Sequence, residues 1–256
     1  MRLVYVHGAC VRDADWWWHR MVAPLAAVGV RSRAVALPSC RGDTPGDRLV
    51  TRPAPGCASG PSDGARLAGQ GLGDLYDDVD AVRAVIDEDD EPVVLLGHSY
   101  GGIVITDASH GHPAVRQLVY VTSMMPDVGE SQASVAGAGP APCLDPGEDG
   151  TTGVLPDHVR ELFVQDCDAA TADAAVGRLT RQAMNPFGQP VRAAAWRDVP
   201  ATYIVCTDDR AIPAEVQRER ATRAGAVVEF AAGHHPFLSR PEDFAALLLD
   251  VTSPAR

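Results

Sequence analysis

Short apolar runs alternate with segments of helical period along most of this chain of 256 residues. Apolar runs bounded by turn residues are typical of strands, and apolar residues spaced by three or four are typical of helices. Their alternation predicts an α/β fold with a mostly parallel central sheet flanked by helices. The expected strands are Leu3–Val6, Arg33–Leu37, Val93–Leu96, Leu118–Val121, Thr202–Cys206 and Val227–Phe230. The expected helices are Trp16–Val28, Leu75–Ile86, one that starts with Ile103–Ala108, Ala214–Ala224 and Pro241–Leu249.

Two stretches interrupt this alternation. Residues 39–73 are rich in Gly, Pro, Ser and Arg without a sustained period, which indicates a long excursion between packed elements. Between residues 123 and 200 the strands lapse, and only Asp157–Gln165 and Asp168–Met184 have a helical pattern. We interpret residues 123–200 as a small lid inserted into a single domain that spans residues 1–256.

Composition excludes several classes of function. The formal net charge of −12 argues against nucleic-acid or anionic-membrane partners, which bind basic surfaces. The chain contains no lysine, so Schiff-base chemistry is excluded. The six cysteines lie far apart without a C-x-x-C pair, which favours free thiols over a zinc site, with a bridge such as Cys143–Cys167 as the alternative. No signal-peptide pattern and no apolar run of about 20 residues occurs, and we expect a cytoplasmic protein.

The strongest chemical signal is the sequence Gly-His-Ser-Tyr-Gly-Gly at residues 97–102. It fits the pattern G-x-S-x-G between a buried strand and a helix, where a sharp turn lifts the serine hydroxyl above the end of the sheet. Glycines at 97 and 101 remove side chains that would clash in such a turn. The alternative is that Ser99 only caps the following helix. The context favours Ser99 as a nucleophile.

A serine nucleophile needs a base and an orienting carboxylate, which in this arrangement follow later strands in the order acid, then histidine. Both positions are filled. The strand that ends at Cys206 is followed by Asp208 and Asp209, and the strand that ends at Phe230 is followed by His234 and His235. From position alone, either aspartate is the candidate acid. Either histidine is the candidate base, and the other forms a wall of the site.

An oxyanion hole needs two backbone N–H groups near the attacked carbonyl. One is expected from Tyr100, which follows the nucleophile, and the other from Ala9 in the loop after the first strand, where Gly8 allows close approach. Pocket candidates are Gly8, Met124, whichever histidine is not the base, and one or two of Trp16–Trp18, among which we select Trp17. Core packing is the alternative for Trp17 and Met124. Phe163, Phe187 and Trp196 are possible lid contacts, and His7 is interpreted as structural.

These residues together resemble the small-esterase branch of the α/β-hydrolase superfamily, which contains plant methylesterases and hydroxynitrile lyases. The resemblance spans nearly the whole chain but is concentrated in short motifs. The matching stretches are VHGAC at 6–10, the tryptophans at 16–18, GHSYGG at 97–102, VTSMMPD at 121–127, YIVCTDDRAIP at 203–213 and GHHPFLSRP at 233–241.

The resemblance implies an α/β-hydrolase fold and assigns roles within the motifs. The family's acid lies four residues before the proline of D-x-x-I-P, which selects Asp209, and its base follows the glycine of G-H-x-P-x-L-S, which selects His234. His235 then becomes the pocket wall, and the oxyanion donors fall on Ala9 and Tyr100. The family's lyases have threonine and lysine where this chain has Gly8 and His235, which argues against cyanohydrin cleavage.

The sequence therefore predicts a serine hydrolase that cleaves a small carboxylic ester, or a lactone or thioester, through an acyl-enzyme without metal or cofactor. Ser99, His234 and Asp209 are its expected nucleophile, base and acid. Two alternatives use the same scaffold. One is a ligand-binding protein with negligible turnover, and the other is a non-hydrolytic catalyst such as a cyclase or perhydrolase, because fold and triad alone do not decide function.

Overall fold

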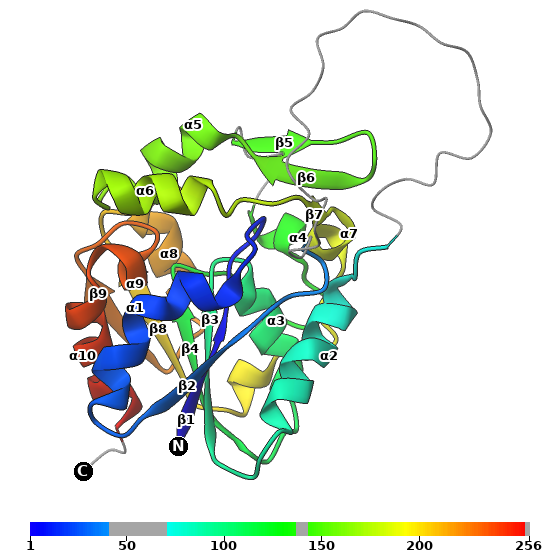
Figure 1. The fold of residues 1–256 in the computed structure, drawn as a ribbon. Helices are drawn as coiled ribbons and strands as arrows, with labels where there is room; N and C mark the ends of the chain where they lie inside the picture. The colour runs from blue at the N-terminus through cyan, green and yellow to red at the C-terminus, as the bar shows by residue number, and fades with distance from the viewer. Residues whose placement is uncertain (41–70, 137–142, 254–256) are drawn as a thin grey trace, which may run out of the picture.

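A six-stranded, entirely parallel sheet forms the centre of the molecule, in the strand order β2-β1-β3-β4-β8-β9 (Figure 1). The computed structural model describes residues 1–40, 71–136 and 143–253. Most of the expected excursion at residues 39–73 lies outside the described residues. The strands of the sheet are β1 (Arg2–Val6), β2 (Arg31–Val35), β3 (Val93–His98), β4 (Val115–Val121), β8 (Ala201–Cys206) and β9 (Ala226–Phe230).

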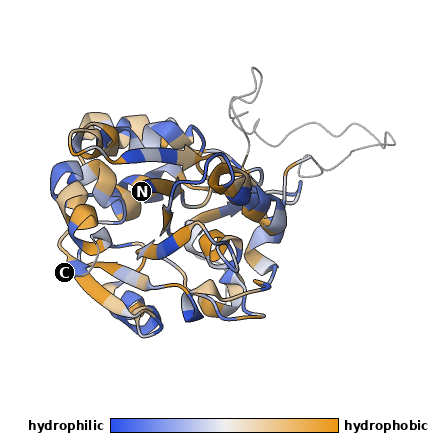
Figure 2. Cartoon of the chain, turned by 90° about the horizontal axis from the view of Figure 1, so that it is seen from below, coloured by the Kyte–Doolittle hydropathy of each residue, from blue (hydrophilic) through white to orange (hydrophobic). Residues whose placement is uncertain are grey.

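Helices cover both faces of this sheet, as the alternating sequence predicts. The apolar side chains of α1, α9 and α10 pack on one face, and those of α2, α3 and α8 pack on the other. Within β1, Leu3 and Tyr5 point to the first face and Val4 and Val6 to the second, so the strand is buried on both sides. The helices are α1 (Ala14–Ala26), α2 (Leu75–Ile86), α3 (Gly101–Ala108), α8 (Ala214–Ala221), α9 (Pro236–Ser239) and α10 (Pro241–Thr252). Figure 2 shows that hydrophobic and hydrophilic residues both occur along the helices of the molecule.

The segment between β4 and β8 lies across the carboxyl ends of the strands (Figure 1). It contains a three-stranded antiparallel sheet, β5-β6-β7, which the sequence analysis did not anticipate. Bridges from Val11 to Leu179 and from Cys40 to Gln182 join this segment to the loops that follow β1 and β2. Its elements are β5 (Leu144–Pro146), β6 (Thr151–Val154), β7 (Gln182–Ala183), α4 (Gln132–Ala136), α5 (Pro156–His158), a π-helix (Val159–Phe163), α6 (Ala169–Val176), α7 (Asn185–Gly188) and a 3-10 helix (Ala195–Arg197).

The expected helix Asp168–Met184 is wrong in its second half. Asp168 caps α6 by accepting from the N–H of Thr171, but the helix ends at Val176, before Gly177. Leu179 then pairs with Val11, and Gln182 enters a strand. Tertiary pairing has therefore overridden the local helical pattern. The segment Asp157–Gln165 is helical in part, as one turn of α-helix followed by the π-helix.

Boundaries of other elements shift by one to three residues from the expected ones. Helix α1 begins at Ala14 and ends at Ala26, earlier than expected at both ends, and α8 ends at Ala221. The five described cysteines, Cys10, Cys40, Cys143, Cys167 and Cys206, are free thiols, so the alternative Cys143–Cys167 bridge is absent. Among the described residues, no helix has the length and apolar character needed to span a bilayer.

Helix α3 starts so close to β1 and β3 that only glycine fits at two positions. A Cβ atom on Gly101 would lie 2.3 Å from the backbone oxygen of Val6, and one on Gly97 would lie 2.8 Å from the oxygen of Gly101. Real carbon atoms do not approach backbone oxygen so closely. The pair of glycines therefore sets the sharp turn between β3 and α3, in which Ser99 lies.

The variant Gly101→Ala tests this packing. Because the clash is with backbone rather than a movable side chain, we expect it to lower the free energy of unfolding by about 2 kcal/mol or more. Gly188→Ala is the matched control, since a Cβ there meets nothing within 4 Å, and it is expected to change stability by less than about 0.5 kcal/mol. Urea denaturation of the two variants and the wild type measures both values. Equal stability of the two variants would contradict the steric account.

Candidate active site

Ser99 occupies the turn between β3 and α3 in a strained backbone conformation. Its φ of 51° is in the left-handed region, which non-glycine residues adopt at a cost of roughly 1–3 kcal/mol. Hydrogen bonds from Ser99 N to Val121 O (3.2 Å) and from Gly102 N to Ser99 O (3.2 Å) hold the turn. The strain is therefore maintained by the surrounding strands, and it places the Ser99 side chain at the wall of a cavity.

Asp209 and His234 meet at the carboxyl ends of neighbouring strands. The loop after β8 carries Asp209, the loop after β9 carries His234, and His234 Nδ1 lies 2.8 Å from Asp209 Oδ2. Both side chains are almost completely buried. Because a carboxylate accepts hydrogen bonds, Nδ1 carries the proton of a neutral His234, and its Nε2 is left with a lone pair.

Several donors converge on the Asp209 carboxylate. The N–H groups of Ala211 (2.8 Å) and Ile212 (3.0 Å) donate to Oδ1, and Thr122 Oγ1 and Gln217 Nε2 donate to Oδ2. Burial on its own would raise the pKa of this carboxyl, but the charge and hydrogen bond of His234 and the other donors outweigh it and lower the pKa. Asp209 is therefore held as an anion.

The alternatives left open by position have different surroundings. Asp208 is exposed to solvent, whereas Asp209 is buried against His234. His235 is also buried, but its Nδ1 donates to the backbone oxygen of Phe163 (2.9 Å). Among the described residues, only Asp209 and His234 from these two loops form a carboxylate–imidazole pair.

Near Ser99, the backbone N–H groups of Ala9 and Tyr100 donate no hydrogen bond to another described residue. The side chains around them form a buried polar network. Cys10 N donates to Gln182 Oε1 (2.9 Å), Gln182 Nε2 donates to Ser39 Oγ (2.9 Å), and Ser39 Oγ donates to Asp78 (2.6 Å). Tyr100 donates its hydroxyl to the same Asp78 oxygen (2.7 Å). One network thus links the residue after Ala9 to Tyr100.

A cavity of about 300 Å³ brings most of the predicted residues together, although Asp209 and Tyr100 do not line it. Ser99, His234 and Ala9 line it, as do all four pocket candidates, Gly8, Trp17, Met124 and His235. Phe163 and Phe187 also line it, whereas Trp196 does not and donates its indole N–H to Pro126 O (2.7 Å). The remaining lining is mostly aliphatic: Val11, Ala136, Leu144, Val154, Val159, Leu179, Ala211, Ile212, Pro213 and Val216.

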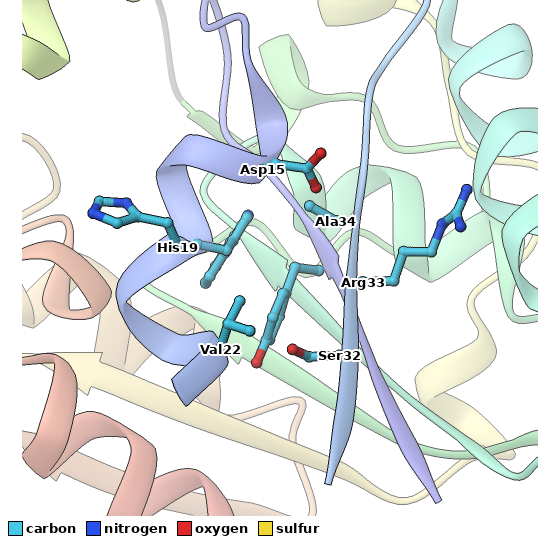
Figure 3. Close-up of a pocket in the computed structure, with 8 residues that line it drawn as sticks. Asp15, His19, Val22, Ser32, Arg33 and Ala34 are labelled. Atoms are coloured by element: carbon cyan, nitrogen blue, oxygen red, sulfur yellow. The ribbon is translucent and has the colours of Figure 1, made fainter. Parts of the chain in front are cut away.

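A second cavity of about 390 Å³ lies between α1 and β2 (Figure 3). It is lined by Tyr5, Asp15, Trp18, His19, Val22, Ser32, Arg33 and Ala34. It contains none of the predicted site residues that lie in the loops after the strands. Its one guanidinium, on Arg33, pairs with Glu88 (2.8 Å) and turns away from α1. The chemistry of the side chains therefore places the candidate site at the first cavity.

Sequence reasoning missed three residues of this region. Thr122 follows β4 with a φ of 38° and donates to Asp209, and Gln217 of α8 donates to the same carboxylate. Arg220 reaches the cavity from the end of the same helix. The position of Thr122 after a strand was a readable signal. Nothing in the sequence distinguishes Gln217 or Arg220 from the exposed polar residues of α8.

Comparison with known proteins places this chain in a family. The model of the Alpha/beta hydrolase family matches residues 3–247. This chain belongs to that family. The fold expected from the sequence is thereby confirmed. A solved pyrethroid hydrolase from Sphingobium faniae has the same fold, with a TM-score of 0.77, 25% identity, and coverage of 98% of this chain and 96% of that chain.

Curated relatives confirm the branch that the sequence resembles. Polyneuridine aldehyde esterase of Rauvolfia serpentina is 27% identical and covers 97% of this chain and 94% of its own length. Methylesterase 7 of Arabidopsis thaliana is 26% identical and covers 98% and 95%. Both relatives are esterases by name, in agreement with the expected class of carboxylic ester hydrolase.

Three buried histidines around the site are held neutral. Burial lowers the pKa of His7 to about 4 and that of His235 to about 3, and it lowers the pKa of His98 well below the ordinary value. Each ring donates to a backbone oxygen, of Gly8, Phe163 and His234 respectively. In contrast, burial raises the pKa of the Asp78 carboxyl to about 6, although hydrogen bonds from Ser39 and Tyr100 oppose this.

These shifts predict opposite effects of two variants on the pH dependence of stability. His7 has a folded-state pKa below its unfolded value of 6.5. Its contribution to the free energy of unfolding is therefore fully present above pH 6.5 and is lost as pH falls towards 4. Asp78 has a raised folded-state pKa, so stability is gained as pH falls below about 6. His7→Gln should therefore flatten the dependence of unfolding free energy on pH, and Asp78→Asn should steepen it, each by about 1.4 kcal/mol per pH unit.

Urea denaturation between pH 5 and 6.5 measures these slopes, with the wild type as reference. The comparison uses slopes because either substitution also changes stability at a fixed pH. Slopes that change in the same direction in both variants would contradict the assignment of charge states.

Proposed function

We propose that this protein is a serine esterase in which Ser99 attacks the carbonyl carbon of a small carboxylic ester. The observation that carries the proposal is the buried pair formed by His234 and Asp209, 2.8 Å apart, beside a cavity that Ser99 also lines. A serine hydroxyl becomes an effective nucleophile when a neighbouring base takes its proton. The His234–Asp209 pair supplies a base whose tautomer is fixed by a carboxylate.

In the proposed first step, His234 Nε2 takes the proton of Ser99 as the oxygen bonds to the acyl carbon. Asp209 stays ionised, holds the ring and stabilises the imidazolium that forms. The Ser99 hydroxyl makes no hydrogen bond with a described residue. This geometry suits an unliganded site, since catalytic hydrogen bonds often tighten only when substrate binds.

The negative charge of the tetrahedral intermediate is proposed to fall between the N–H groups of Ala9 and Tyr100. Neither group has a protein acceptor among the described residues, and Tyr100 immediately precedes α3, whose dipole favours negative charge at this end. His234 then gives its proton to the leaving alcohol. Water activated by the same imidazole hydrolyses the acyl-enzyme and regenerates Ser99.

The cavity limits the size of the substrate. A volume of about 300 Å³ is at the lower end for small-molecule sites, and its mostly aliphatic wall favours a compact, largely apolar ester. Lactones and thioesters react through the same tetrahedral chemistry and fit the proposal. Two relatives that are esterases by name align with more than nine-tenths of this chain. They support ester cleavage over the two alternatives, pure ligand binding and non-hydrolytic catalysis.

The first test compares the wild type with Ser99→Ala on short-chain para-nitrophenyl esters, together with labelling by a fluorophosphonate. Turnover and labelling are expected in the wild type, and both are expected to vanish in the variant because no other hydroxyl replaces the nucleophile. Stoichiometric ligand binding without turnover or labelling of the wild type would contradict the proposal and favour a binding protein. Products other than acid and alcohol would favour a non-hydrolytic catalyst.

A second test separates the two neighbouring aspartates. Asp209→Asn should lower kcat by roughly 10⁴-fold, because an asparagine N–H in place of the carboxylate favours the wrong tautomer of His234. The exposed Asp208→Asn is the matched control and should retain most of the activity. Steady-state kinetics on the best ester of the panel measures both. Similar kcat values for the two variants would exclude Asp209 as the orienting acid.

A further inference from the structure

One charged side chain lines the otherwise mostly apolar cavity outside the proposed machinery: Arg220, near the end of α8. Its Nη1 is shielded from solvent and has no hydrogen-bond partner among the described residues. Arg220 is half-buried and contacts Tyr203, yet a shielded Nη1 without an acceptor is costly, because this part of the charged group has lost water without gaining a partner. A position of this kind calls for a compensating group, and because Arg220 lines the cavity, a ligand bound there can supply one.

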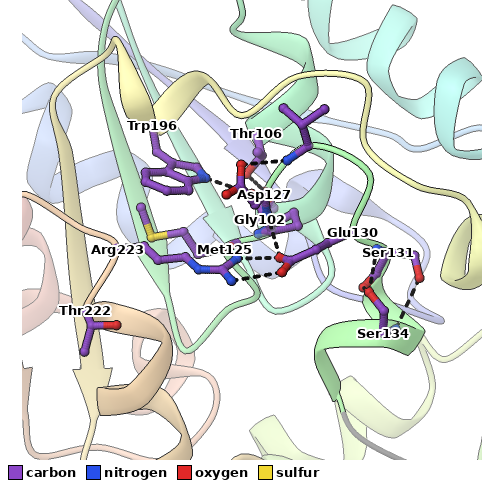
Figure 4. Close-up of polar contacts among 12 residues, drawn as sticks. Gly102, Thr106, Met125, Asp127, Glu130, Ser131, Ser134, Trp196, Thr222 and Arg223 are labelled. Atoms are coloured by element: carbon purple, nitrogen blue, oxygen red, sulfur yellow. Dashed lines mark hydrogen bonds and ion pairs between the residues drawn. The ribbon is translucent and has the colours of Figure 1, made fainter.

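The arginines that flank Arg220 are paired. Arg218 donates to Glu229 (2.7 Å). Arg223 donates to Met125 O (2.8 Å) and to Glu130 Oε1 (3.0 Å), and these three residues are drawn in Figure 4. The Arg223–Glu130 pair also fixes the end of α8 to the segment that leads into α4. Arg220 is thus held on a clamped element, and of these three arginines only Arg220, which lines the cavity, has a buried guanidinium nitrogen without a partner among the described residues.

Neighbouring groups only partly compensate the charge of Arg220. Burial lowers the pKa of its guanidinium, and Tyr203, Glu219 and Asp209 raise it. The Tyr203 hydroxyl accepts from the guanidinium but also donates to Ser123 O and accepts from Ser123 N, and the Asp209 carboxylate already accepts from its own donors. Arginine nevertheless stays charged at this site, because its intrinsic pKa lies far above neutrality.

A second unpartnered polar atom lines the same cavity. Gln132 Oε1, at the start of α4, is buried without a hydrogen-bond partner among the described residues. The amide of glutamine can rotate to present either its oxygen or its N–H₂ group. Gln132 and Arg220 therefore supply adaptable hydrogen-bonding capacity from two clamped elements, in a wall that is otherwise mostly aliphatic.

We propose that Arg220, assisted by Gln132, is a specificity-determining residue. It binds an ionised carboxylate that the substrate carries in addition to the ester group that is cleaved. This inference rests on the proposed esterase function. The planar guanidinium suits a carboxylate, to which it can donate two parallel hydrogen bonds. Because the whole chain carries a net charge of −12, its long-range field repels such a substrate. Recognition then depends on the local guanidinium.

The test uses matched ester pairs that differ in the carboxylate. Mono-para-nitrophenyl adipate is compared with para-nitrophenyl hexanoate for a carboxylate on the acyl side, and para-acetoxybenzoate with para-tolyl acetate for one on the alcohol side. In Arg220→Met, kcat/KM for the carboxylate-bearing member of one pair should fall by about 10- to 100-fold, chiefly through KM. The neutral member should change by less than about threefold.

Two further variants keep this result interpretable. Arg218→Met removes an exposed arginine from the same helix and should leave the preference within each pair unchanged. Arg220→Lys keeps the positive charge but loses the planar guanidinium that donates two parallel hydrogen bonds. It should retain part of the preference for the carboxylate-bearing ester. Activity on the neutral esters shows that each variant is folded. Equal losses on both members of each pair would overturn the proposal, because Arg220 would then act through Asp209 or through folding.

Binding separates this proposal from the esterase mechanism itself. Monomethyl adipate should raise the thermal unfolding temperature of the wild type and of Ser99→Ala, but not that of Arg220→Met. If the wild type hydrolyses no ester yet shows this pattern, the esterase proposal fails and the carboxylate subsite stands. If the three proteins respond alike, the subsite is overturned whatever the turnover.

Discussion

The contact of α3 with β1 and β3 is the constraint on which the rest of the candidate site depends. Because Gly101 brings the helix against the backbone of Val6, the turn between β3 and α3 has no room for an ordinary conformation, and Ser99 takes a φ of 51°. The same approach brings Tyr100 beside the loop that carries Ala9. Nucleophile and proposed oxyanion donors are thus positioned by a single packing contact, and backbone geometry rather than side-chain choice sets their spacing.

A second level of organisation is the buried polar network behind that turn. Asp78 accepts from Ser39 and Tyr100, and Ser39 accepts from Gln182, a residue of the segment that covers the sheet. Since Gln182 also binds the N–H of Cys10, the covering segment is tied directly to the loop after β1. Buried polar networks stabilise a structure only when their members are satisfied. Displacement of β7 would therefore leave Cys10 N without its acceptor and Ser39 Oγ without its donor, the amide of Gln182.

Much of this arrangement was predictable because it follows from periodicity and strand order. Parallel strands end at one edge, so residues after β1, β3, β8 and β9 had to gather there, and the motifs identified Ser99, Asp209 and His234 as the ones to examine. Local pattern failed where long-range pairing decided the structure. Residues after Val176 look helical, yet Leu179 and Gln182 pair with Val11 and Cys40. Arg220 could not be singled out because its place at the cavity and its contact with Tyr203 follow from tertiary packing and not from the local pattern of α8.

The charge distribution around the cavity sets opposing requirements for the site. Asp209 has to remain anionic to hold His234, and the hydrogen bonds that ensure this also saturate it. It is therefore unable to serve as a complete hydrogen-bond partner for Arg220, although its negative charge raises the pKa of the guanidinium. An incompletely paired arginine near a saturated carboxylate is costly for the unliganded fold. Such a cost is consistent with a role in recognition. A carboxylate of a bound ligand would supply an acceptor for Arg220 Nη1, which has none among the described residues.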